Sequence, residues 1–165
     1  MLIWLSIIVL VPFDLSTIDS VTDQKEDSLV KRIMNIGKDL IKGSGKLKDA
    51  ASVMLAKLVT RPDVVKTGET DAILKEFACQ FDEMREDPTK LQSSTGIVLT
   101  LVEIFKTGHR DDLLSRVDLI FKPILEVPVK NKFISKSTIL KKAKTNLAQR
   151  IGCIFLKPRV AKWRY

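Results

Sequence analysis

Apolar residues recur along this chain every three or four positions, which is the spacing of one face of an α-helix. The first such series ends at Gly43-Ser44-Gly45 and the second ends before Pro62, so together they predict two antiparallel helices joined by a glycine turn. The first series consists of Leu29, Val30, Ile33, Ile36, Leu40 and Ile41. The second consists of Leu47, Ala50, Ala51, Met54, Leu55, Leu58 and Val59.

Four further helices are predicted beyond residue 62. The third is centred on 73–81 and ends near Asp87-Pro88, the fourth covers 91–105, the fifth begins at Asp111 or Asp112 and is kinked or ended by Pro123, and the sixth covers about 133–155. Helix pairs then start near residues 28, 70 and 111, an interval of about 40 that is typical of HEAT and armadillo repeats. We therefore expect an all-α fold in which 28–165 form one continuous α-solenoid, with an ordinary helical bundle as the alternative.

The first thirteen residues, MLIWLSIIVLVPF, are apolar on all sides. They lack the basic start and the cleavage pattern of a secretory signal, and they are too short to cross a bilayer. We expect a core helix that ends at Pro12 and belongs to a preceding repeat, which suggests a chain cut from a longer protein. Residues 14–27 are polar and without periodicity, and they predict a linker.

Positive charge is concentrated at the C-terminal end. The formal net charge is +8, yet residues 127–165 hold eleven Lys or Arg and no acid, which leaves −3 for residues 1–126. Between the apolar positions of the sixth helix lie Lys141, Lys142 and Lys144, so this helix is predicted to bury one face and present these charges on the other. The candidate partner-binding residues are Lys141, Lys142, Lys144, Lys157, Arg159, Lys162 and Arg164.

Charge alone leaves the partner open. The basic segment fits an acidic protein, a nucleic acid, a membrane surface or merely a solvated face. Aromatic residues, on which single-stranded bases would stack, are sparse there. Phe133 and Phe155 fall on the apolar helix face and are expected in the core, which leaves Trp163 and Tyr165.

No catalytic, metal or cofactor site is recognisable. Gly43-Ser44-Gly45-Lys46 lacks the preceding glycine and following hydroxyl of a phosphate loop, because Leu40 and Leu47 occupy those places, and it is interpreted as a helix-pair turn. His109 belongs to a polar turn. Cys79 and Cys153 have no metal-ligand spacing and are expected to be buried free thiols of a reducing compartment. Composition, 45% hydrophobic and 29% charged, argues for a folded chain.

Four stretches resemble the family of tubulin-specific chaperone D, also called tubulin-folding cofactor D. They are Leu2–Asp19, Gly45–Val64, Leu101–Leu113 and Arg150–Tyr165, of which WLSIIVLVPFDLS and FLKPRVAKWRY are the most specific. The resemblance implies a HEAT or armadillo-like, non-enzymatic cytoplasmic protein of the microtubule cytoskeleton. It also implies that the parent binds β-tubulin, assembles with cofactors C and E and an Arl-type small GTPase, joins α- and β-tubulin, and stimulates tubulin GTP hydrolysis.

Overall fold

The computed structural model describes residues 2–19, 28–84, 87–127 and 132–156, and within these ranges it contains helices and no strand. The long helices are α2 (Leu29–Leu40), α3 (Gly45–Val59), α5 (Glu69–Met84), α6 (Leu91–Thr107) and α10 (Thr138–Phe155). The shorter elements are α1 (Leu2–Ile8), η1 (Leu15–Thr17), α4 (Pro62–Lys66), η2 (Pro88–Lys90), α7 (Arg110–Leu114), α8 (Val117–Ile120), the π-helical turn η3 (Phe121–Leu125) and α9 (Lys132–Ser135).

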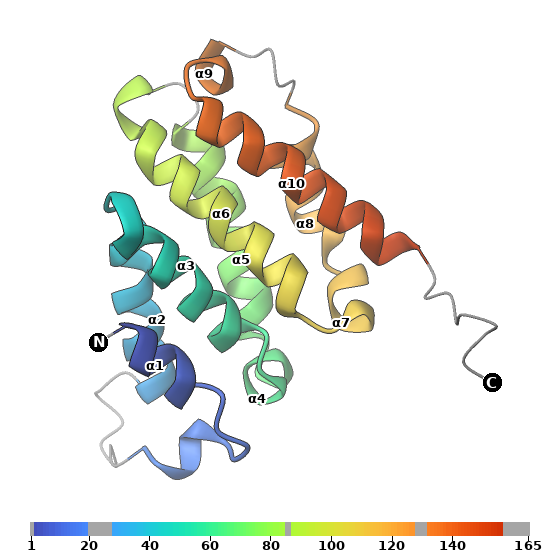
Figure 1. Cartoon of the computed structure of the whole chain (residues 1–165). Helices are drawn as coiled ribbons and strands as arrows, with labels where there is room; N and C mark the ends of the chain where they lie inside the picture. Colours follow the sequence, from blue (N-terminus) through green and yellow to red (C-terminus); the bar gives the residue numbers. More distant parts are fainter. Residues whose placement is uncertain (1, 20–27, 85–86, 128–131, 157–165) are drawn as a thin grey trace, which may run out of the picture.

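The helices form two layers (Figure 1). One layer holds α3, α6 and α10 side by side, with α6 in contact with both of the others. The second layer holds α2, α5 and α8, each behind the long helix of its own pair. The pairs start at Leu29, Glu69 and Arg110, which confirms both the interval of about 40 residues and the predicted α-solenoid.

Three local features differ from the helices expected. Pro62 begins the additional helix α4, because its missing N–H has no partner to lose at a helix start. The fifth helix is divided into α7, α8 and η3, and the wider η3 turn contains Pro123, which cannot donate to a regular helical ladder. The sixth is divided as well, because the Ser137 hydroxyl accepts from the Leu140 N–H and starts a new helix.

Close backbone approach joins the layers. A Cβ added at Gly96 of α6 would lie 2.1 Å from the backbone oxygen of Ile41, so only glycine allows this contact between α6 and the end of α2. Buried hydroxyls meet between α3 and α6, where Thr100 donates to Ser52 Oγ over 3.1 Å. Gly45 takes φ +66° at the start of α3, in agreement with the predicted glycine turn.

The N-terminal segment is fastened by one buried arginine. Arg61, which precedes α4, donates to the backbone oxygens of Val9, Val11 and Phe13 and forms an ion pair with Asp63 at 2.9 Å. Burial raises the pKa of Asp63, but hydrogen bonds from Arg61 and from the N–H groups of Leu15 and Val64 outweigh it, so this pKa lies below its ordinary value.

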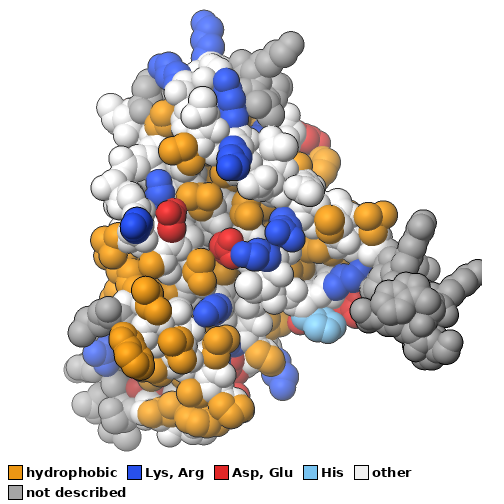
Figure 2. Space-filling model, in the orientation of Figure 1, with side chains coloured by type: hydrophobic (Ala, Val, Ile, Leu, Met, Phe, Trp, Pro, Cys, Tyr) orange, Lys and Arg blue, Asp and Glu red, His pale blue; other side chains and the backbone are white. Residues whose placement is uncertain are grey.

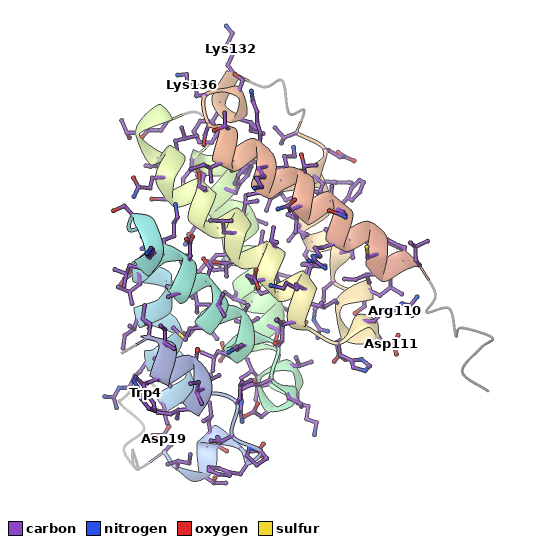
Figure 3. The ribbon with its side chains drawn as sticks, viewed as in Figure 1. Trp4, Asp19, Arg110, Asp111, Lys132 and Lys136 are labelled. Atoms are coloured by element: carbon purple, nitrogen blue, oxygen red, sulfur yellow. The ribbon has the colours of Figure 1, made fainter. Side chains whose placement is uncertain are left out.

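Residues 14–19 are more than the linker expected of 14–27. Leu15 is buried in the common core, and its N–H donates to Asp63 Oδ2 over 3.3 Å. Residues 20–27 lie outside the described part of the chain. The preceding helix α1 contacts α3, while the outer side of the segment stays apolar and exposed, with Trp4 72% accessible (Figures 2 and 3). Helix α1 ends at Ile8, before the Pro12 at which it was expected to end.

Candidate partner-binding surface

Helix α10 buries a stripe that includes a lysine. Its buried residues are Leu140, Ala143, Lys144, Leu147, Ile151 and Ile154. Lys144 is only 4% exposed, so the prediction that it projects into solvent was wrong. The signal was present in the sequence, because Lys144 stands four residues after Leu140 and three before Leu147, on the same helical face.

The Lys144 ammonium is buried without a partner. Its Nζ has no hydrogen-bond acceptor among the residues that the structure describes. Burial lowers the pKa of Lys144 to about 8, because an ammonium removed from water is disfavoured relative to the neutral amine. A buried cation of this kind is a natural position for an incoming carboxylate, which would supply the missing charge and acceptor.

A cavity of about 500 Å³ lies beside this lysine, between α10 and the η3 turn. Its walls include Phe121, Leu125, Ile151 and Phe155, so the lining is largely apolar. Phe121 is exposed, and Phe155 is 58% exposed, whereas the sequence analysis placed Phe155 in the core. Exposed aromatic side chains around a pocket are typical of protein interfaces. We call this site, with Lys144 at its base, the Lys144 groove.

The remaining predicted cations divide into two groups. Lys141 is half-buried and Lys142 is exposed, so both stand on α10 beside the groove. Lys157, Arg159, Lys162 and Arg164 lie outside the described residues. Lys132 and Lys136 project from α9 at the end of the molecule where α10 begins (Figure 3).

The other candidate groups show no catalytic arrangement. His109 is an exposed residue immediately before α7, as expected for a turn. Cys79 and Cys153 are both exposed, which corrects the prediction of two buried thiols. Cys79 lies on the outer face of α5 and Cys153 on the outer face of α10, because other residues of these two helices form the buried apolar stripes. Among the described residues, no group of three His, Cys, Asp or Glu side chains could hold a metal ion.

The fold and this surface define a class of protein: an armadillo-like helical repeat segment with a cationic, apolar-walled groove. In its described residues, no helix is both long and apolar enough to cross a membrane.

Comparison with known proteins finds similarity to tubulin-specific chaperone D. The family described as "Tubulin-specific chaperone D-like, ARM repeat" matches residues 1–79. Tubulin-specific chaperone D of Dictyostelium discoideum is 29% identical over 189 aligned positions, which cover 99% of this chain and 13% of that protein. The chain is therefore similar to tubulin-specific chaperone D and corresponds to a small part of that relative's length. No solved structure matches it significantly.

Proposed function

We propose that this chain is a non-enzymatic segment of a tubulin-folding cofactor and that it binds β-tubulin. The relative's name supports the tubulin-folding role, and the unpartnered Lys144 ammonium in an apolar-walled groove is the structural observation that carries the binding role. A β-tubulin surface that presents a carboxylate between apolar side chains would complete this groove. The occupant of the groove is an acidic protein surface. Burial disfavours the charged form of Lys144, and a carboxylate placed beside it would stabilise that form.

The wider role follows the family. As part of a cytoplasmic, cytoskeleton-associated complex with cofactors C and E and an Arl-type small GTPase, the parent protein would assemble α- and β-tubulin and stimulate tubulin GTP hydrolysis. In this proposal residues 1–13 belong to a preceding repeat, and residues 28–165 form one continuous array. The segment then contributes binding surface to the complex and leaves the hydrolytic chemistry to tubulin.

Association kinetics with β-tubulin over a salt series test the binding role. Lys144→Met keeps the length of the side chain and removes its charge, and it should raise the dissociation rate, because it removes one side of a buried charge pair. Lys142→Met removes the same charge from an exposed position on the same helix, and it should chiefly slow association and flatten its salt dependence.

The outcomes separate the alternatives. Equal effects of the two substitutions on dissociation would contradict a role for the groove. Failure of the unmodified chain to bind β-tubulin would contradict the proposed function itself. Preferential binding of nucleic acid, with an affinity that collapses between low and moderate salt, would instead favour the basic helical-repeat alternative.

A further inference from the structure

Three long helices begin at one end of the molecule, at a cavity whose lining residues differ from those of the Lys144 groove. The helices α3, α6 and α10 run side by side in the same direction, and their N-terminal ends meet at the same end of the layer (Figure 1). A cavity of about 470 Å³ lies between these ends. All three helix starts line it, among other residues through Ser44, Lys48, Gln92, Thr95 and Ser137.

The electrostatics of this cavity are positive at the starts of α3 and α10. Each helix N-terminus carries the equivalent of about half a positive charge on its free N–H groups. An acid stands in the first turn of α4, α5, α7 and α8, whereas α1, α2 and α9 have none there. The helices α3, α6 and α10 have no acid in the first turn. Asp87 accepts hydrogen bonds from the backbone and side chain of Thr89 at the start of η2, which leads directly into α6, so its carboxylate offsets the positive charge of that helix end.

A buried lysine adds to this charge. Lys48 is 8% exposed, lines the cavity, and forms no side-chain hydrogen bond or ion pair with any described residue. It is the fourth residue of α3, where a cation is repelled by the positive end of its own helix. A cation that has no partner among the described residues and lies at the positive ends of α3 and α10 is stabilised when an anion enters the cavity.

Two hydroxyl groups are available for the same anion. Ser44, the residue before α3, makes no capping bond with its side chain. Ser137 Oγ accepts the Leu140 N–H over 3.1 Å, so its own hydrogen remains free to donate. By contrast, the Thr95 hydroxyl already donates to the Leu91 oxygen. The free donors therefore come from α3 and α10, on opposite sides of the cavity.

We propose that this cavity binds the dianion of a phosphate monoester. The ends of α3 and α10, of about half a charge each, and the Lys48 ammonium together carry about two positive charges, which match a dianion better than a monoanion. The three outer oxygens of the phosphate can accept from Lys48, Ser44 and Ser137. The volume exceeds that of a phosphate ion, which leaves room for the esterified group. This site is independent of the proposed tubulin binding, and because Gly43–Lys46 is no phosphate loop it implies no nucleotide hydrolysis.

Titration of the 165-residue chain with inorganic phosphate tests the proposal, with sodium nitrate of equal ionic strength as the monoanion control. Phosphate should raise the melting temperature, and the amide NMR signals that shift should be those of 44–48 and 137–140. Lys48→Met should weaken phosphate binding about tenfold or more, since hydrogen bonds to charged groups are among the strong ones. Lys46→Met, an equal charge change at an exposed residue outside the cavity, should change the affinity less than about twofold.

Several results would overturn the proposal: nitrate as effective as phosphate, shifted amides elsewhere in the chain, or equal losses in the two lysine variants. Lys48→Met should fold, because the Lys48 ammonium has no partner among the described residues to lose. If it does not, Ser44→Ala replaces it, since the Ser44 side chain caps no helix, and it should weaken phosphate binding several-fold, whereas unchanged affinity would count against the site.

Two further probes distinguish the sources of the phosphate group. O-phosphoserine in a short peptide represents a modified protein, and a nucleoside monophosphate represents a small metabolite. Tighter binding of the peptide than of inorganic phosphate assigns the site to a phosphorylated protein segment. Tighter binding of the nucleotide assigns it to a metabolite, and equal binding shows that the phosphate alone is recognised.

Discussion

Replacing Lys144 with methionine should make the free protein more stable. The side chain is almost completely buried, its ammonium has no partner among the described residues, and its pKa is lowered from 10.5 to about 8. At about 1.4 kcal/mol for each pKa unit, the charged form is destabilised in the folded protein by about 3 kcal/mol at most. Methionine has a similar length and is apolar, so it fills the same space without this penalty.

The stability of the parent protein should rise with pH in one window. Below pH 8 the lysine is charged in both folded and unfolded states, so the full penalty is present. Between about pH 8 and 10.5 the folded state releases its proton while the unfolded state retains it, so stability rises with pH in this window. Lys144→Met should therefore be about 2 kcal/mol more stable at pH 7, and the gap should close as pH approaches 10.5.

Urea unfolding of both proteins from pH 6 to 10.5 measures this difference. Lys142→Met serves as the control, because it makes the same change at an exposed residue of α10 and should leave the free energy of unfolding nearly unaltered. A less stable Lys144→Met variant, or parallel pH curves for variant and parent, would show that the ammonium has a partner or reaches water.

Three other perturbations test the packing. Leu55→Asp should unfold the α2–α3 pair, because Leu55 is fully buried and an unpaired buried carboxylate costs about 3–5 kcal/mol; an unchanged melting temperature would refute that assignment. Gly96→Ala should lower the free energy of unfolding by about 1–3 kcal/mol, because the new Cβ would meet the Ile41 backbone oxygen. The control is Gly152→Ala, which adds a Cβ in open space on α10 and should be neutral or stabilising by up to about 1 kcal/mol. Equal effects in urea titrations would contradict the close approach. The ionised Asp63 contributes stability above the ordinary pKa of aspartate, and this contribution is lost as the pH falls below that value. Asp63→Asn should remove part of it. Identical acid unfolding curves for variant and parent would mean that the pairing with Arg61 contributes nothing.

Periodicity and helix ends were sufficient for the fold. The apolar spacing around Ile33, Leu58 and Leu101 identified the long helices, since burial of one face requires that period whatever the partner. Glycine and proline placed most of the boundaries, because each restricts the backbone locally. The resemblance to tubulin-specific chaperone D followed from particular stretches of residues. All of these features can be read from the order of residues along the chain.

The sites depended on how the helices pack. The apolar series of α3 suggested that Leu47 faces the core, but Leu47 is 49% exposed and its neighbour Lys48 is buried. A rotation of one residue position on a helix is about 100°, and only the neighbouring helices decide which of two adjacent residues is covered. On α10, packing against the neighbouring helices likewise buries Lys144 and leaves Phe155 exposed.

By itself, then, the sequence determined where the long helices lie, how often the helix pairs repeat and which proteins the chain resembles, because these depend on local spacing and residue identity. Only the tertiary structure decided that two lysines are buried. It also brought the starts of α3, α6 and α10 to one cavity, although they lie about 45 residues apart in sequence. Stacking of successive helix pairs produces that convergence, and no single pair contains it.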